Sequence, residues 1–451
     1  MSNRAISSLL GAAFGLAASG FAFAADTVSR VFAFVSNISR PRPLNIAWLG
    51  LAIFAAGCQP SDITACDPQG CISEAAFRNN IVNAVSGQAV GYVATVGGLG
   101  PTFAGIARTS ADPPNLAMLP SLDIDVASVS KTLTAIGVLQ ALANHVPSIS
   151  LGSSISPYIY TDWHQGPNIN TITFNDLLTH RSGFPGNNVC GGDNTTYSVL
   201  KNIINNGVSS THETDNGGNG NYSNCNFAMF RELLFIMEGN SINNLPDGSQ
   251  RAQKSADFYV SYMNQHVFSP VGVHAVTCAP NSDPNFAMLS YPSPPGNYPG
   301  WNGSQVNTPT GDWTLSCGGG GWNVSAGDLF LVLNDIASGN VLLTPAQKAL
   351  MSSSTGHFPG WDNAVRNDCP SPQALCKNGE ISGNANNNSS NPSASIVTYL
   401  GVFKCSVPVV VVVNSALSQD IINIVENAYN ALPQSGPPQP CPSGSLLASG
   451  G

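Results

Sequence analysis

The pattern of hydrophobic and polar positions predicts helices and strands in a defined order along most of the chain. Apolar residues at helical spacing predict helices over 73–85, 127–144, 227–237, 256–267, 326–337 and 421–432. Apolar, β-prone runs, several of them bounded by Gly, Pro or Asn, predict strands over 89–96, 103–109, 375–381, 396–404 and 408–413. This order predicts an α/β fold with one antiparallel sheet of about five strands, built from both chain ends and flanked by helices. We expect the domain to span 73–432 and to contain a mostly helical insert over about 121–314.

The first 57 residues have the pattern of an export signal region. Arg4 precedes an apolar run over 9–23, and Ala22-Phe23-Ala24 has the small-x-small pattern of a cleavage site. The apolar run is too short for a confident membrane span. A chain cut after Ala24 would be a plain secreted protein.

A second signal-like unit follows the first. An apolar run over 44–54 leads into Ala55-Ala56-Gly57-Cys58, which resembles a bacterial lipoprotein box, although such boxes usually have Leu where Ala55 stands. In this interpretation Cys58 is lipidated and anchors the protein to a membrane, with residues 58–72 as a tether. Two signals in tandem are redundant, which favours a true start downstream of Met1. Either alternative predicts an exported protein, periplasmic, on the cell envelope or secreted, with a Pro/Gly/Ser-rich tail over 433–451.

Composition narrows the class of protein. A net charge of −9 with only 9% charged residues leaves no basic patch to neutralise phosphates, which excludes nucleic acid as a partner. The 11 cysteines of an exported chain are expected to form disulfides. With Cys58 set aside, neighbours in the sequence suggest the pairs Cys66/Cys71, Cys190/Cys225, Cys278/Cys317, Cys369/Cys376 and Cys405/Cys441. The sequence has no Cys-x-x-Cys and no ligand-spaced group among its seven His, so we expect neither a metal nor another cofactor.

A candidate nucleophile lies at the start of the predicted helix over 127–144. Ser128 and Lys131 are three positions apart and therefore share one face of that helix. A hydroxyl needs a neighbouring base to become a nucleophile, and a buried Lys with a lowered pKa can act as that base. The same spacing occurs at Ser198 and Lys201, where we expect only a solvated helix surface.

Two further motifs follow in order. Tyr222-Ser223-Asn224 precedes the predicted helix over 227–237; its phenol could relay a proton, and Asn224 could bind the Lys131 amine or a substrate carbonyl. Lys377-Asn378-Gly379 lies on the first strand of the C-terminal β-rich region. There Lys377 would supply positive charge, and Gly379 would let a substrate approach the strand backbone.

Together these motifs resemble the serine β-lactamase and penicillin-binding-protein superfamily, in the branch of class C β-lactamases, D-alanyl-D-alanine carboxypeptidases and related esterases. Connecting segments are similar too: Leu177 to Gly183 resembles the family stretch LLTHTSG, Pro270 to Val273 resembles PLGM, and Gly319 to Leu329 resembles a GG-to-DL segment. The resemblance covers about residues 73–432. It implies a β-lactamase/transpeptidase-like fold and a serine hydrolase for small-molecule or peptide substrates, and it does not specify the oligomeric state.

The resemblance also implies a role for each motif residue. Ser128 would form an acyl-enzyme, and Lys131 and Tyr222 would share the acid and base work. Asn224 would orient Lys131, and Lys377 would add charge near Tyr222 and any substrate carboxylate. The backbone N–H groups of Ser128 and Glu380 would form the oxyanion hole. His180 would be structural.

The sequence departs from the family pattern at Asn378 and Glu380. Family β-lactamases commonly have Thr or Ser at the first of these positions and a small residue at the second. An acid at Glu380 could disfavour carboxylated substrates such as β-lactams, or its side chain could simply point to solvent. The Asn-rich stretch 384–391 would lengthen a hairpin near the cleft. The resemblance therefore favours a D-amino-acid peptidase or an esterase over an efficient β-lactamase. The alternative is a catalytically weak binding protein of the cell envelope.

Overall fold

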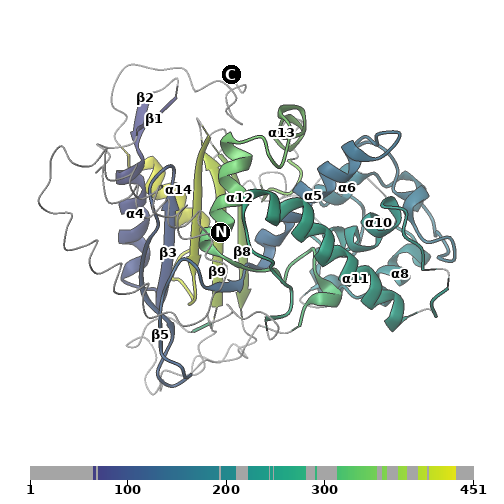
Figure 1. Ribbon diagram of the computed structural model, residues 1–451, viewed down its shortest axis with the longest axis horizontal. Coiled ribbons are helices and arrows are strands. Elements are labelled where there is room, and N and C mark those ends of the chain that lie inside the picture. Colours follow the sequence, from purple (N-terminus) through teal and green to yellow (C-terminus); the bar gives the residue numbers. More distant parts are fainter. Residues whose placement is uncertain are drawn as a thin grey trace, which may run out of the picture. The chain divides into compact units, whose positions relative to one another are not determined.

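Six strands form one antiparallel sheet in the order β5-β4-β3-β10-β9-β8 (Figure 1). Their bounds are β3 Gly91–Val96, β4 Thr102–Arg108, β5 Leu116–Ala117, β8 Ala374–Ser382, β9 Ser395–Phe403 and β10 Val407–Val413. The predicted antiparallel sheet is confirmed, with the two-residue β5 as a sixth strand in place of the expected five.

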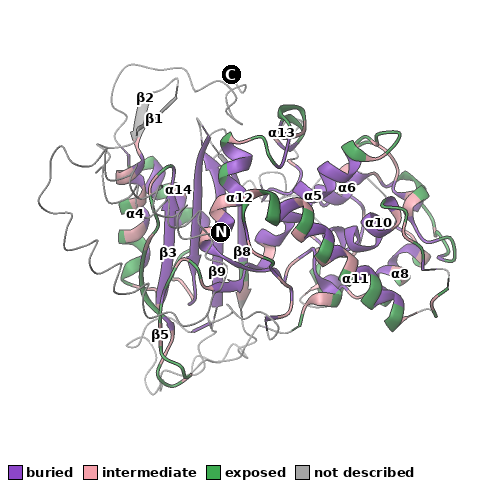
Figure 2. Ribbon diagram, in the orientation of Figure 1, coloured by how far each residue is buried: buried purple, intermediate pink, exposed green. Residues whose placement is uncertain are grey.

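The sheet joins the two ends of the chain through β3 and β10. Val409 pairs with Val96 and Val413 with Tyr92 in an antiparallel register. Successive side chains of a strand point to opposite faces, and β10 buries both of its faces. Val409, Val411 and Val413 belong to one hydrophobic cluster, and Val410 and Val412 to another. Both faces of the sheet must therefore be covered, and Figure 2 shows β3, β8 and β9 among the buried elements.

Helices cover the two faces. On one side lie α4 (Glu74–Ser86) and α14 (Ile421–Asn430), whose apolar residues share a cluster with Val409 and Val411. On the other lies α12 (Ala326–Ser338), whose Leu329 and Leu333 share a cluster with Val410. Each helix begins at a side-chain cap, from Ser73, Asp420 and Ser325 respectively. These caps fix where the helices meet the sheet.

The region between β4 and α12 is mostly helical. It contains α5 (Ser130–Asn144), α6 (Phe174–Leu178), α7 (Asn187–Cys190), α8 (Tyr197–Asn206), α9 (Asn224–Ala228), α10 (Phe230–Met237) and α11 (Ser249–Met263), which continues as the π-helical turn η4 (Asn264–Phe268). A short antiparallel ladder of β6 (Asp123–Asp125) and β7 (Asn323–Ser325) brings the two ends of this region together. The helix α13 (Pro345–Ser352) follows α12.

The computed structural model describes residues 64–67, 70–191, 194–209, 222–242, 244–246, 248–280, 290–291, 312–352, 358–362, 374–382, 395–403 and 406–432. The predicted signal region 1–57, Cys58, the Asn-rich stretch 384–391 and the tail 433–451 lie outside these residues. At the N-terminal side, β1 (Thr64–Asp67) pairs with β2 (Gly70–Ser73). Among the described residues, no helix is long and apolar enough to span a membrane.

Two of the predicted disulfides are confirmed. Cys190 is bonded to Cys225, and Cys278 to Cys317. Cys376 is also disulfide-bonded, and its expected partner lies outside the described residues. Cys66 stands opposite Cys71 in the β1–β2 ladder, so the backbone places this predicted pair together.

Candidate active site

Ser128 is presented by a strained turn between β6 and α5. A short 3₁₀ turn, η1 (Ala127–Val129), precedes α5, and Ala127 has a φ of 50°, a conformation that costs energy for a residue with a side chain. The carboxylate of Asp125, at the end of β6, accepts a hydrogen bond from the Ala127 N–H at 2.8 Å. Burial raises the pKa of Asp125 to about 7, against the opposing effect of hydrogen bonds from Ala127 and Gly321. This turn leaves Ser128 partly exposed at the start of a buried helix.

Lys131 lies one helical turn after Ser128 and is fully buried. Its ammonium group donates to Ser128 Oγ at 3.0 Å, to Asn224 Oδ1 at 2.7 Å and to the Gly319 carbonyl. These three acceptors match the three N–H donors of an ammonium group. Burial nevertheless lowers the pKa of Lys131 to about 8, with a further lowering by the nearby Lys377 and an opposing effect of Tyr222. A group in this range can exchange a proton near neutral pH.

Tyr222 completes the surroundings of the Ser128 hydroxyl. Its Oη donates to Ser128 Oγ at 2.8 Å. Burial acts to raise the pKa of Tyr222, but the positive charges of Lys131 and Lys377 together outweigh burial and lower it. The His180 ring stacks on the Tyr222 ring at 4.3 Å between centroids, and its Nδ1 accepts from the Ser223 N–H at 3.2 Å. His180 therefore holds Tyr222 in place from the side of its ring.

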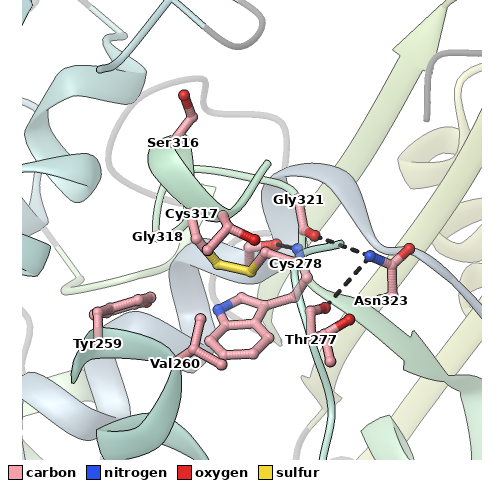
Figure 3. The surroundings of a disulfide bond; sticks show 12 residues. Tyr259, Val260, Thr277, Cys278, Ser316, Cys317, Gly318, Gly321 and Asn323 are labelled. Carbon is pink, nitrogen blue, oxygen red and sulfur yellow. Dashed lines mark hydrogen bonds between the residues drawn. A yellow bond between two sulfur atoms is a disulfide. The ribbon is translucent and has the colours of Figure 1, made fainter. Parts of the chain in front are cut away.

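The glycine run after the predicted insert supplies an acceptor that the sequence did not reveal. Thr134 Oγ1 donates to the Gly318 carbonyl at 2.7 Å, and Lys131 donates to the carbonyl of Gly319. A Cβ on Gly319 would lie 2.7 Å from the Asn224 carbonyl oxygen, so only glycine fits this close approach. Figure 3 shows the Cys278–Cys317 disulfide directly before this run.

The segment around the disulfide is fixed from its other side by Asn323. The Asn323 side chain donates to the carbonyls of Thr277 and Gly321, each at 3.3 Å (Figure 3). The backbone that carries the Gly319 carbonyl is therefore held by a disulfide bond and by side-chain hydrogen bonds. This packing, and not phosphate binding, explains the glycine run.

Lys377 forms an ion pair that sequence reasoning missed. Its Nζ lies 3.5 Å from Tyr222 Oη and donates to the Asp362 carboxylate, and both charged side chains are almost completely buried. The second oxygen of Asp362 accepts from the Asn378 N–H at 3.1 Å. Asp362 stands in a short segment, 358–362, with no recognisable motif. The one signal in the sequence that could have predicted this pair was the low content of charged residues. A Lys that is buried in such a chain needs an acidic partner nearby.

Gly379 and Glu380 lie on β8, an edge of the six-stranded sheet. A Cβ on Gly379 would lie 2.4 Å from Thr398 Oγ1 and 2.5 Å from the Val126 carbonyl, so β8 packs closely against the turn before Ser128. The Asn378 N–H points off the sheet, toward Asp362. Alternate N–H groups of a strand point the same way, so the Glu380 N–H also points off this edge. The Glu380 side chain is exposed, as one of the two sequence interpretations expected.

The fold also gathers three residues that could be taken for metal ligands. Asp123, His274 and Asp328 offer ligand atoms within 4.8 Å of one another, although sequence spacing indicated no such group. Each carboxylate engages a different ring nitrogen of His274, at 3.2 Å in both cases. These two hydrogen bonds raise the pKa of His274 to about 10. The two carboxylates therefore favour the protonated imidazole, in which neither ring nitrogen has a lone pair for a metal.

The motif residues predicted from sequence therefore meet at one place. Ser128, Lys131, Tyr222 and Asn224 form one hydrogen-bonded group, and Lys377 and Gly379 border it on β8. The second Ser-x-x-Lys pair, Ser198 and Lys201, lies on α8, where Ser198 is exposed.

Comparison with known proteins assigns the chain to a family. The beta-lactamase family model matches residues 124–370, more than half of the chain. The chain belongs to the beta-lactamase family. A search of curated proteins gave no match.

Solved structures resemble the chain over most of its length. A β-lactamase/D-alanine carboxypeptidase from Yersinia pestis is 15% identical with a TM-score of 0.55, covering 79% of this chain and 98% of that one. A class C β-lactamase from Rhodobacter sphaeroides is 16% identical with a TM-score of 0.52, covering 78% and 97%. A D-amino acid amidase from Ochrobactrum anthropi is 13% identical with a TM-score of 0.52, covering 79% and 98%. At these identities the likeness shows the β-lactamase/transpeptidase-like fold.

Proposed function

We propose that this member of the beta-lactamase family is a serine hydrolase that cleaves esters or amides through an acyl-enzyme on Ser128. The observation that carries the proposal is the position of Ser128 Oγ, which lies 3.0 Å from Lys131 Nζ and 2.8 Å from Tyr222 Oη. Both neighbours have lowered pKa values: that of Lys131 is about 8, and that of Tyr222 is lowered by the charges of Lys131 and Lys377, which favours proton transfer through both groups. A hydroxyl between two such groups is an activated nucleophile.

In the acylation step, Ser128 Oγ attacks the substrate carbonyl carbon while its proton passes to the neutral amine of Lys131. The tetrahedral intermediate then collapses, and the bond to the leaving group breaks. Tyr222 gives its proton to the leaving oxygen or nitrogen, and Lys131 returns a proton to Tyr222. In deacylation, water attacks the acyl carbon, its proton enters the same pair, and Ser128 leaves with a proton restored. Asn224 holds Lys131 in position throughout.

The oxyanion of each tetrahedral intermediate would be bound by the backbone N–H groups of Ser128 and Glu380. Ser128 stands in the first turn of a helix, where N–H groups have no intrahelical acceptor. The N–H of Glu380 points off the edge of β8, which packs against the same turn. Gly379 permits this close packing.

Two structural neighbours are named a β-lactamase/D-alanine carboxypeptidase and a D-amino acid amidase, which suggests acyl donors that contain a D-amino acid residue. We further propose that the protein is exported, because its paired cysteines fit an oxidising compartment. Lipid on Cys58 would give a mature N-terminus at that residue, and an N-terminus at Ala25 measured by mass would contradict it.

The test is labelling of the intact protein with a fluorophosphonate probe, followed by peptide mapping. We expect one adduct, on Ser128, and none in Ser128→Ala. The matched control is Ser198→Ala, which removes the exposed Ser of the second Ser-x-x-Lys pair and should label like the wild type. No adduct on a protein shown to be folded would contradict the proposal and favour a binding protein that keeps the site as scaffold.

A further inference from the structure

The buried pair of Lys377 and Asp362 bears on which substrates the site accepts. An ammonium beside the nucleophile can attract a substrate carboxylate only if its charge is available. Here the Lys377 side chain is 2% exposed and the Asp362 side chain 1% exposed, and the two are in direct contact. Asp362 is held by a second donor, the Asn378 N–H. The carboxylate position next to Lys377 is therefore already occupied by the protein.

The segment that carries Asp362 is itself anchored. Thr132 Oγ1, from α5, donates to the Gly360 carbonyl at 2.7 Å. The Gly360 N–H donates to the Leu178 carbonyl, at the end of α6, at 3.1 Å. Asp362 is thus attached to the same helix that presents Ser128 and Lys131, and it cannot swing away without breaking buried hydrogen bonds.

The position of Lys377 shows which part of a bound substrate the Lys377–Asp362 pair would affect. Lys377 Nζ lies 3.5 Å from Tyr222 Oη, and Tyr222 is the group proposed to protonate the leaving group. Lys377 therefore faces the leaving-group side. With Asp362 in direct contact, the charge of Lys377 is balanced by the protein itself at this place.

We propose that Asp362 restricts the site to acyl donors whose leaving group has no carboxylate, namely neutral or cationic esters and amides. This inference rests on the proposed function. A leaving-group carboxylate beside Lys377 would lie next to the like charge of Asp362, which opposes binding. Asp362 is a specificity-determining residue that acts through Lys377, and it takes no part in the covalent steps.

The experiment compares two thioesters that differ only in that charge: acetyl-D-alanyl mercaptoacetate and its methyl ester, with thiol release as the readout. For the wild-type full chain we expect kcat/KM for the methyl ester to exceed that for the carboxylate by about tenfold or more, where tenfold corresponds to ~1.4 kcal/mol. Asp362→Asn keeps the side-chain shape but removes its charge. We expect it to shift the ratio at least about tenfold toward the carboxylate.

Two further comparisons complete the test. The wild-type ratio keeps the proposal falsifiable if Asp362→Asn does not fold, because equal rates for the two thioesters overturn it. Asp257→Asn, which removes an exposed acid on α11, should leave the ratio unchanged. A ratio that stays at the wild-type value in folded Asp362→Asn also overturns the proposal, because a merely structural loss lowers both rates alike.

The outcomes separate this inference from the proposed function. Fluorophosphonate labelling of Ser128, combined with wild-type hydrolysis of the carboxylate as fast as the methyl ester, overturns the inference and leaves the nucleophile standing. Labelling of Ser128 without turnover of either thioester overturns the inferred substrate class and also leaves the nucleophile standing. Absence of labelling and of turnover contradicts the proposed function itself.

Discussion

The ammonium group of Lys131 has an acceptor for each of its N–H bonds, and yet burial holds its pKa at about 8 instead of 10.5. Below that pH the protonated form predominates and cannot accept the Ser128 proton; above it the amine is available. We therefore expect the rate of Ser128 labelling to rise with pH through about 8. The apparent pKa will belong to the Lys131–Tyr222 pair, because the two groups interact strongly.

Replacing Lys131 tests this reasoning. An arginine remains protonated at every accessible pH, so Lys131→Arg should lower the labelling rate by roughly 100-fold or more and abolish its rise near pH 8. The matched control is Lys201→Arg, in the second Ser-x-x-Lys pair, which should keep the wild-type rate and profile. A Lys131→Arg profile that still rises near pH 8 would show that another group is the base.

At the same scale, the sequence predicted some site residues and not others for a physical reason. Ser128 and Lys131 could be paired because helical spacing alone puts them on one face. Asp362 could not, because its contact with Lys377 depends on how the segment 358–362 docks on α5 and α6. The Gly319 carbonyl could not be predicted either, because every residue type has a backbone carbonyl that can accept a hydrogen bond.

At the scale of elements, the cluster of Asp123, His274 and Asp328 joins β6, α12 and the segment after η5 (Ser269–Val271). The pKa of His274 is raised from 6.5 to about 10, so its contribution to stability is complete below pH 6.5 and is lost as the pH rises through 10. Because His274 is about one-third exposed, solvent screening limits this contribution to roughly 1–2 kcal/mol.

The measurement is the free energy of unfolding of His274→Gln against the wild type, by urea titration at several pH values. The difference should be largest near pH 6, should fall as the pH rises and should vanish above pH 10. Exposed His164→Gln serves as the control and should match the wild type at each pH. A difference that grows with pH would mean that His274 is held as the neutral imidazole.

Several of the elements that sequence patterns missed or misplaced have little apolar signal. The helix α11 begins at Ser249, seven residues before the predicted start at 256, because its first two turns are almost entirely polar. The predicted helix over 227–237 is divided between α9 and α10, with Met229 between them. The strands β5, β6 and β7 have two or three residues each, too few to show a period. Their pairing depends on tertiary contacts.

At the scale of the whole molecule, the sheet built from both chain ends could be predicted from the order of its elements. The β-rich runs at each end need partners, and the intervening region has mostly helical spacing. The neighbour relation of β3 and β10 could not be deduced, because the register of two long-separated strands depends on which faces the helices cover. The confirmed disulfides could be predicted from sequence proximity, given the expectation of an exported chain, and needed no knowledge of the fold.

The Cys190–Cys225 disulfide gives the last prediction, because it ties the helical region to the site. It links α7 to α9, and a second contact runs beside it, from the Asn224 N–H to Asn187 Oδ1 at 3.2 Å. The bond closes a loop of 35 residues, so removing it should lower the free energy of unfolding by about 2–4 kcal/mol. Since Asn224 holds Lys131, the loss should also slow labelling of Ser128 under conditions where the protein remains folded.

Cys190→Ala/Cys225→Ala, compared with the wild type by urea unfolding and by fluorophosphonate labelling, tests both effects. The control is Cys190→Ala alone, which also lacks the bond and should reproduce the double variant's labelling rate if the bond itself is responsible. Lower stability with an unchanged labelling rate would mean that Asn187 and the helix packing hold Asn224 without covalent help. In that case the disulfide stabilises the fold, and the geometry of the nucleophile depends on its own hydrogen bonds.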